Sequence, residues 1–300
     1  MSNANIHPEK IIAIDWSGRM DLAGQRRHIA GAIWTSHGVF VESGRTRAGW
    51  IAWLVEQARQ TPRMVVSLDC CFSYPAWFLT ERGCTTVFDF WRHVAEGHGE
   101  RWLSRECLPR DERFWGKPHK KPAQFRGEGM PRMMRLTDME NKIVEGMSAA
   151  RAALVRGIAP KSPFQIGGAG SVGTGSLRAI PFLLQLHEAG FRIWPFESAA
   201  LDAKRPKPLV IEMYARLLTG AVKKSSAEAR RAYLRAKMRE DAFYSSLKRG
   251  VVAKAVASED VFDALISVME MARHAGSFAG LKKTRNPVQK LEGITWVPAL

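Results

Sequence analysis

The chain has few cysteines and no long apolar run, and both absences exclude classes of protein. Only four cysteines occur in 300 residues, no two of them form a C-x-x-C pair, and no histidine spacing completes a zinc site. No apolar stretch approaches the ~20 residues of a membrane helix, and the first residues lack the basic and apolar regions of a signal peptide. We therefore expect a cytoplasmic protein in a reducing compartment, with no membrane partner.

Acidic residues are also scarce relative to basic ones. The chain has 45 Lys and Arg residues against 29 Asp and Glu residues, which gives a formal net charge of +16. Such an excess favours binding to phosphate backbones with salt-sensitive affinity. We expect nucleic acid or a nucleotide as partner; the plain alternative is a soluble protein with a basic surface.

Apolar runs and turn residues predict an α/β protein. The first part reads as β-β-β-α-β, with strands at 10–15, 28–35, 39–43 and 64–68 and a helix at 49–59. Further on, the pattern predicts helices at 138–156, 176–189 and 261–273, a basic helical region at 222–249, and strands at 191–196, 209–213 and 294–297. Proline, glycine and charge are frequent at about 75–150, which indicates a basic insertion or lid. We expect one domain spanning 1–300.

Acidic residues at the ends of predicted elements are the most informative feature. Asp15, Asp69 and Glu212 each close an apolar strand, and Asp260 and Asp263 share one face of a later helix. A carboxylate beside a core is unfavourable unless it is paired or binds a metal. Two-metal enzymes need three or four carboxylates on rigid elements, and Mg²⁺ prefers such hard oxygen ligands. We predict that Asp15, Asp69, Glu212 and Asp263 are catalytic ligands of one or two Mg²⁺ or Mn²⁺ ions, with Asp260 as alternate or second ligand.

Each of these acids also has an ordinary structural interpretation. Ser258 is a plausible helix N-cap, which would place Asp260 in a first turn where the helix dipole favours acids. Asp15 could begin the turn Asp-Trp-Ser-Gly, and Asp69 could pair with an arginine.

The same motifs resemble a known family. Ile14-Asp15, Leu68-Asp69, Ile211-Glu212-Met213-Tyr214, Asp260-Val261-Phe262-Asp263-Ala264 and the tail Glu292-Gly293-Ile294-Thr295-Trp296 are similar to the predicted RNase H-like nucleases (domain of unknown function 429) of the ribonuclease H-like superfamily. The resemblance covers roughly 10–70 and 160–297. It implies a mixed five-stranded sheet with flanking helices and a two-metal phosphodiesterase site acting on nucleic acid. The chain departs from the pattern in its insertion and in having Asp69 where the superfamily's Holliday-junction resolvases have Glu.

A glycine-rich segment at 167–176 gives a rival signal. Gly168, Gly170 and Gly173 match G-x-G-x-x-G ahead of a predicted helix, with Ser171 between them. One interpretation is a dinucleotide site. Another is a phosphate cradle, in which backbone N–H groups hold a nucleic-acid phosphate or the nucleotide of a phosphotransferase or ATPase. The third is a loop whose Ser171 or Thr174 caps the helix; a hydrolase nucleophile elbow is disfavoured because no apolar strand precedes it.

A basic stretch within the insertion suggests a nucleic-acid surface. Lys117, Lys120 and Lys121 are followed by further basic residues and are interleaved with aromatic ones: His119, Arg126, Arg132, Arg135, Trp115 and Phe125. Bases stack on aromatic rings while Lys and Arg follow the backbone. A solvated loop held down by its aromatic residues is the alternative. Charge alone would also suit a non-catalytic nucleic-acid-binding protein.

Overall fold

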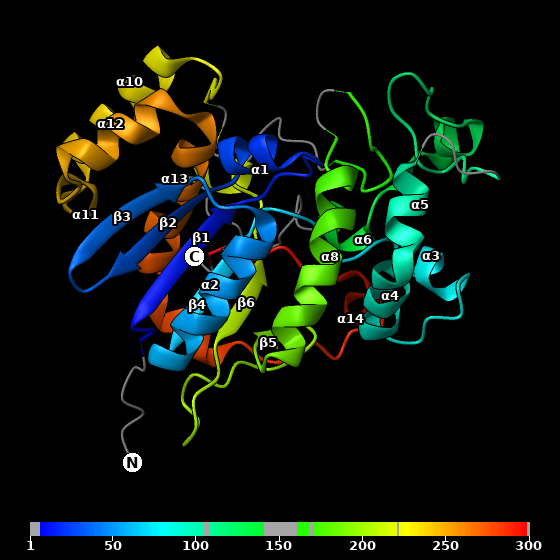
Figure 1. The fold of residues 1–300 in the computed structure, drawn as a ribbon, viewed down its shortest axis with the longest axis horizontal. Helices are drawn as coiled ribbons and strands as arrows, with labels where there is room; N and C mark the ends of the chain where they lie inside the picture. The colour runs from blue at the N-terminus through cyan, green and yellow to red at the C-terminus, as the bar shows by residue number, and fades with distance from the viewer. Residues whose placement is uncertain (1–6, 105–108, 141–160, 169–170, 221, 299–300) are drawn as a thin grey trace.

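The computed structural model describes residues 7–104, 109–140, 161–168, 171–220 and 222–298, and it has an α/β architecture. Six strands form one mixed sheet in the order β3-β2-β1-β4-β6-β5 (Figure 1). The expected α/β class is confirmed, whereas the expected count of five strands is wrong by one: β5 (Arg192–Ile193) adds a two-residue edge. Among the described residues, no helix is both long enough and apolar enough to cross a membrane.

The centre of the sheet is three parallel strands. β1 (Lys10–Asp15), β4 (Met64–Leu68) and β6 (Leu209–Glu212) lie side by side, and their carboxyl ends therefore meet at one edge. On the other side of β1, β2 (Ala30–Thr35) and β3 (Gly38–Ser43) pair antiparallel. β4 and β6 are buried along their whole lengths, which is why their sequences are nearly continuous apolar runs.

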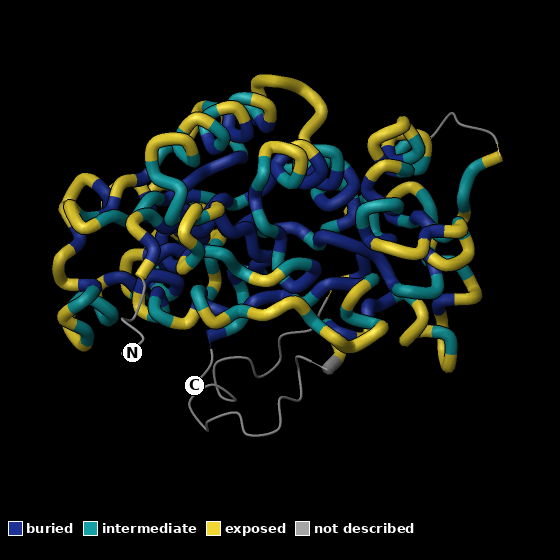
Figure 2. The backbone as a smooth tube through the Cα atoms, turned by 90° about the horizontal axis from the view of Figure 1, so that it is seen from below, coloured by how far each residue is buried: buried dark blue, intermediate teal, exposed yellow. Residues whose placement is uncertain are grey.

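Helices cover both faces of the sheet. Ile12 and Ile14 of β1 face one core with α2 (Arg47–Gln60) and α8 (Gly173–Glu188), whereas Ile11 and Ala13 face a second core. That second core is built with α10 (Ala227–Glu240), α11 (Ala242–Ser245), α12 (Arg249–Ala257) and α13 (Glu259–Arg273). Figure 2 shows the buried backbone running through the middle of the molecule beneath an exposed periphery.

The insertion is helical and packs onto the first core. It contains α3 (Ala76–Thr80), α4 (Val87–His93), the π-helical turn η1 (Val94–His98), α5 (Gly99–Leu103), the 3₁₀ turns η2 (Ala123–Phe125) and η3 (Gly127–Met133), and α6 (Leu136–Glu140). Aromatic rings hold it together: Phe164 lies 4.9 Å from Phe78 and 5.2 Å from Tyr74 between ring centroids. A lid function for this segment stays a prediction.

Several expected boundaries differ from the structure. The turn-rich connection before β2 contains α1 (Leu22–His28), and the expected strand at 294–297 forms one isolated bridge, from Thr295 to Glu212. The helix expected at 138–156 corresponds to α6 up to residue 140, and 141–160 lie outside the described residues. Three short helical segments complete the fold: α9 (Arg216–Thr219), η4 (Ala275–Gly280) and α14 (Gln289–Glu292).

Candidate metal centre

Three of the predicted carboxylates converge at the carboxyl edge of the central strands. Asp15 ends β1, Asp69 directly follows β4, and Asp263 comes from α13, which packs across β1 and β2. Their carboxylate oxygens lie within 4.8 Å of one another. The Asp69 N–H donates to the Ile14 carbonyl oxygen at 3.0 Å, so the two strand ends are fixed relative to each other. Sheet and helix together hold the three ligands on rigid elements, as a metal site requires.

The start of α13 places Asp263 in the protein interior. The Ser258 hydroxyl accepts from the Val261 N–H at 3.3 Å, so the predicted N-cap is confirmed and the helix begins at Glu259. Asp263 lies one turn later and is only 4% exposed. Its Oδ2 pairs with the Lys224 ammonium, whereas its Oδ1 has no hydrogen-bond partner among the described residues. A buried carboxylate oxygen without a partner is costly, and a cation would satisfy it.

Burial and repulsion between neighbouring acids raise the pKa values of the three clustered aspartates. Burial, and then the Asp263 and Asp69 carboxylates, raise the pKa of Asp15 well above its ordinary value. Burial and the Asp263 carboxylate raise the pKa of Asp69 to about 7, and burial raises that of Asp263 to about 6 despite the nearby Lys224. Adjacent acids with raised pKa values are more stable when they bind a proton or a metal cation than when they are ionised with no cation bound.

These raised pKa values predict that the metal-free protein loses stability as pH rises. The folded state retains protons on Asp69 and Asp263 that the unfolded chain releases near pH 3.8. Stability should therefore fall as pH rises from about 4 to about 7, by on the order of 3 kcal/mol, and the raised pKa of Asp15 acts in the same direction. Urea unfolding of the metal-free protein across this range measures the effect.

The matched comparison for this titration is Asp69→Asn, which removes one of the acids and should flatten the curve. Added Mg²⁺ should stabilise the unsubstituted protein more at pH 8 than at pH 5, because ligand carboxylates must be ionised. A wild-type curve with the same slope as the Asp69→Asn curve would contradict the assignment.

Lys224 is the internal counterion of the cluster. Burial works to lower its pKa, yet the Asp263, Asp69 and Asp15 carboxylates raise it above the ordinary value. The ammonium therefore pairs with a carboxylate that a bound metal cation would also contact.

We expect Lys224→Met to destabilise the metal-free protein by about 1–3 kcal/mol, because Asp263 loses its partner. Mg²⁺ should restore most of this loss, so the shift in melting temperature on adding Mg²⁺ should be larger in the variant. Lys223→Met, at the preceding position, serves as control and should behave as wild type. An unchanged Mg²⁺ response in Lys224→Met would show that the ammonium and the ion do not share the cluster.

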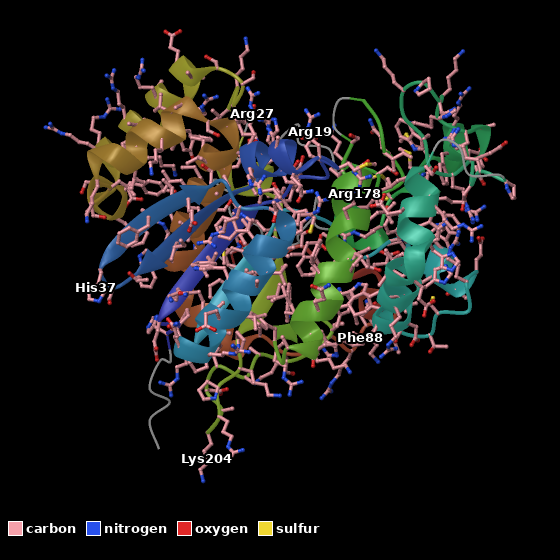
Figure 3. All side chains as sticks on the ribbon, in the orientation of Figure 1. Arg19, Arg27, His37, Phe88, Arg178 and Lys204 are labelled. Atoms are coloured by element: carbon pink, nitrogen blue, oxygen red, sulfur yellow. The ribbon has the colours of Figure 1, made fainter. Side chains whose placement is uncertain are left out.

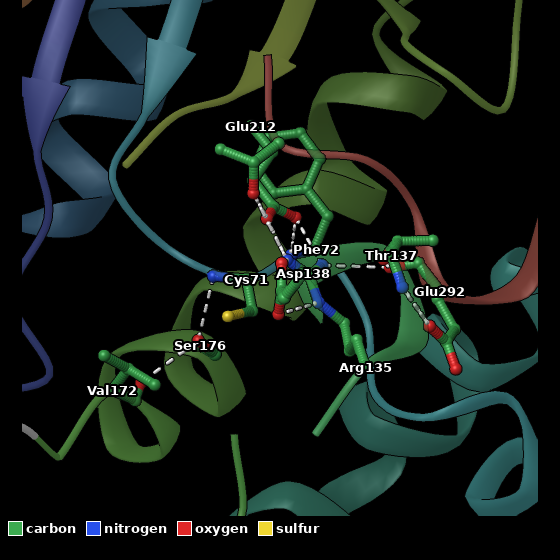
Figure 4. A network of polar contacts seen from close by, with 10 residues as sticks. Cys71, Phe72, Arg135, Thr137, Asp138, Val172, Ser176, Glu212 and Glu292 are labelled. Carbon is green, nitrogen blue, oxygen red and sulfur yellow. Dashed lines mark hydrogen bonds and ion pairs between the residues drawn. The ribbon is translucent and has the colours of Figure 1, made fainter. Parts of the chain in front are cut away.

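Glu212 lies at the same edge but is engaged differently. Its carboxylate forms a two-pronged ion pair with Arg135, and it also accepts from the Thr295 hydroxyl and the Phe72 N–H, each at 2.7 Å (Figure 4). Glu212 is 2% exposed and Arg135 is 1% exposed. The structure thus brings Glu212 to the pocket with its oxygens already saturated, and a role as metal ligand stays a prediction.

Arg135 ties the insertion to the sheet edge. Besides Glu212 it donates to both Asp138 oxygens and to the Glu292 carbonyl oxygen, the last at 2.9 Å. The sequence suggested that Arg135 belongs to a nucleic-acid surface, and this is wrong because its guanidinium is buried with every direction filled. Phe125 is likewise buried, packed on Phe164 at 5.2 Å, so its ring cannot stack on a base.

Asp260 stands at the rim of the cluster. It lies in the first turn of α13, and its Oδ2 is 3.3 Å from His28 Nδ1. It contributes to the raised pKa of Asp15 and Asp263 and lines the same pocket, which leaves open its predicted role as an alternate or second ligand.

The cluster opens into a pocket of about 780 Å³. Among the described residues, seven carboxylate side chains line the pocket against four Lys or Arg side chains, so this lining is acidic in a protein of net charge +16. A locally acidic pocket of this kind concentrates cations.

The glycine-rich segment forms part of the pocket wall. Gly168 and Ser171 line it, and α8 begins there with Val172 as N-cap and no side-chain hydrogen bond to its first turn. Gly173 has a packing reason, because a Cβ there would lie 2.1 Å from the Pro163 carbonyl oxygen. Gly170 lies outside the described residues.

The structure around this segment contradicts three of its interpretations: the dinucleotide site, the nucleophile elbow and the side-chain cap of α8. Residues 164–166 form an isolated bridge from Gln165 to Trp115 rather than a strand of the sheet, so a Rossmann unit and a nucleophile elbow both lack their leading strand. Thr174 donates its hydroxyl to the Ile166 carbonyl oxygen at 2.8 Å instead of capping α8.

The predicted lysines lie apart from the carboxylates. Lys117 lines a small cleft of about 150 Å³ beside Gly167 and Thr174. Lys120 is exposed, and the Lys121 ammonium lies 5.3 Å from the centre of the Trp115 ring. Their role in binding nucleic acid stays a prediction.

Arg135, Lys224 and His28 are the site residues that the sequence did not single out for these roles. Arg135 carried a weak signal, since it stands between apolar residues in Met133-Met134-Arg135-Leu136. Lys224 and His28 carried none, because their partners are 39 and 232 positions away along the chain.

Neither a family model, nor a curated protein, nor a solved structure matches this chain. The geometry of the site therefore carries the functional argument.

Proposed function

We propose that this protein is a Mg²⁺- or Mn²⁺-dependent phosphodiesterase acting on nucleic acid, with a ribonuclease H-like fold. One observation carries the proposal: Asp15, Asp69 and Asp263 converge within 4.8 Å at the carboxyl edge of parallel strands, at the head of an open pocket. The mixed sheet, with its antiparallel β2 and β3 and parallel β1, β4 and β6, is of the kind that the sequence resemblance implies, and β5 adds a sixth strand at its edge.

The donor set fits a hard divalent cation. All three ligands are carboxylates, no nitrogen or sulfur donor is among them, and the unpartnered Asp263 Oδ1 offers a lone pair in the cluster. Bound ions of this class activate an attacking water and stabilise the leaving oxygen of a phosphodiester. The three aspartates would hold the ions. Lys224 and Asp260 at the rim contribute to the net charge of the site that the ions must neutralise.

Basic groups around the pocket support a polyanionic substrate. Arg19 and Lys161 line the pocket and are exposed. Figure 3 shows Arg19 just before α1, Arg27 on α1 and Arg178 on α8, where Arg178 is ion-paired with Glu100. The uncapped start of α8 adds backbone N–H groups that favour a phosphate. Two-ion catalysis with Glu212 as a further ligand would require the Arg135 pair to open, so a site centred on the three aspartates is the simpler form.

A cleavage assay tests the proposal. Labelled single-stranded DNA, duplex DNA, a four-way DNA junction, RNA and an RNA–DNA hybrid are incubated with the protein in Mg²⁺, in Mn²⁺ and in EDTA. We expect cleavage of at least one substrate in either metal and none in EDTA. Cleavage that persists in EDTA, or the absence of cleavage on every substrate despite Mn²⁺ bound at the aspartates, would overturn the proposal.

A nucleotide-binding phosphotransferase or ATPase is the second candidate. It is favoured by the wall of the pocket, where Gly168, Ser171 and the start of α8 face the carboxylates. Calorimetry with ATP and Mg²⁺ separates the two functions: binding followed by phosphate release supports this candidate, and the absence of heat at millimolar nucleotide removes it.

A further inference from the structure

A second group of metal-ligating side chains lies in the insertion, outside the pocket. His93 ends α4, and Glu96 and His98 follow in the π-helical turn η1. Each offers one ligand atom, and the three atoms lie within 4.8 Å of one another. None of the three residues lines the pocket of the aspartates.

The local backbone brings the two histidines together. His93 and His98 are five residues apart, and Gly97 between them adopts φ of 100°, a non-helical conformation that favours glycine and kinks the chain. Their imidazole rings lie 3.8 Å apart between centroids with an interplanar angle of 6°. The kink at Gly97 therefore brings the two imidazoles of this H-x₄-H pair together, stacked face to face.

One basic side chain, Arg82, lies near the histidines. Arg82 is itself paired with Asp111 at 3.0 Å, which limits the positive charge beside the rings. Glu96 is exposed and supplies the one carboxylate of the group.

We propose that His93, Glu96 and His98 bind a divalent transition-metal ion of the zinc class. Two imidazole nitrogens and one carboxylate are a ligand set that zinc accepts, with a fourth position left to water on the exposed side. Zn–N distances of about 2.0–2.1 Å require the two rings to rotate out of their stack, so that one nitrogen of each points at the ion. The nitrogen donors distinguish this site from the all-oxygen site of the aspartates, which suits Mg²⁺ or Mn²⁺.

The position of the ion indicates its role. η1 joins α4 to α5, and all three pack against α8, whose first turn lines the pocket (Figure 1). An ion bridging His93 and His98 would fix the turn in its present form. The proposed site is thus a structural clip for the insertion and needs no catalytic chemistry of its own.

Titration with Zn²⁺, and with Co²⁺ as a spectroscopic probe, tests the proposal. The full chain is used with Asp15→Asn in every sample, so that the aspartate cluster cannot mask the result. We expect one ion per chain, a visible Co²⁺ absorption band of a nitrogen-ligated site, and a rise in melting temperature with Zn²⁺. His93→Ala and His98→Ala should each weaken binding at least about tenfold, and Glu96→Gln should weaken it less.

His37→Ala, an exposed histidine on the β2–β3 turn, is the matched control and should bind as the parent does. If His93→Ala does not fold, His98→Ala and the exposed Glu96→Gln decide the question, with circular dichroism confirming their fold. Unchanged Zn²⁺ affinity in His98→Ala, or no binding at millimolar Zn²⁺, would overturn the site. Neither result bears on the nuclease proposal, which rests on other residues and another metal.

Discussion

Replacing Asp15 by Asn should reduce metal-dependent cleavage by at least about 10³-fold, which corresponds to about 4 kcal/mol of transition-state stabilisation. Asp15 ends β1 at the centre of the carboxylate cluster, and its ligand oxygen lies within 4.8 Å of those of Asp69 and Asp263. An amide keeps the shape of the side chain but removes the charge that holds a divalent cation. Cleavage rates and Mn²⁺ binding by calorimetry, measured on the same samples, should fall together.

The fold should survive this substitution. Asp15 is one of three acids that repel one another, so the Asn variant should unfold at the same or a higher temperature than wild type when both are free of metal. Asp202→Asn, at an exposed position away from the pocket, is the control and should cleave normally. Undiminished cleavage by Asp15→Asn would remove the cluster from the mechanism.

Replacing Arg135 by Met should destabilise the folded protein by about 3–5 kcal/mol. Arg135 is 1% exposed and neutralises Glu212 and Asp138, and its loss leaves two carboxylates in the interior without a counterion. The free energy of unfolding in urea measures the effect. Arg59→Met is the matched control, because Arg59 makes a surface ion pair with Glu56 at 74% side-chain exposure and should cost less than about 1 kcal/mol.

A second substitution separates the charge of Glu212 from its shape. The double variant Arg135→Met with Glu212→Gln should recover part of the lost stability, because the amide needs no counterion. Glu212→Gln alone should weaken Mg²⁺ binding far less than Asp15→Asn does, since Glu212 is saturated by its own partners. A loss below about 1 kcal/mol in Arg135→Met, or loss of Mg²⁺ binding in Glu212→Gln equal to that in Asp15→Asn, would contradict this account.

The sequence predicts the central strands well because strands that are buried on both faces consist of consecutive apolar residues. β1, β4 and β6 are buried on both faces and are continuous apolar runs, so their ends, and with them Asp15, Asp69 and Glu212, are visible in the sequence. α13 was equally predictable from the sequence, because Ser258 caps it and a broad apolar stripe follows. Convergence of Asp15 and Asp69 follows from parallel strands ending at one edge, whereas Asp263 joins them because α13 packs across β1 and β2.

The elements that the sequence did not predict have no clear apolar pattern. α1 begins at an Asp21 cap, but only Gln25 within it is buried, so the helix shows no apolar period. The expected strand at 191–196 pairs over two residues, because Pro195 has no N–H to donate to a ladder. Ion pairs are harder still: Arg135 and Glu212 are 77 positions apart, and nothing local to either residue indicates the other. The partner of a charge is set by tertiary structure alone.

A crystal structure of the protein with Mn²⁺, with the ion located by its anomalous scattering, tests the central claim most directly. The account predicts an anomalous peak bonded to carboxylate oxygens of Asp15, Asp69 and Asp263, with the Lys224 ammonium turned away from Asp263. A map with no peak in that pocket, and with Lys224 still paired to Asp263 at saturating Mn²⁺, would contradict it.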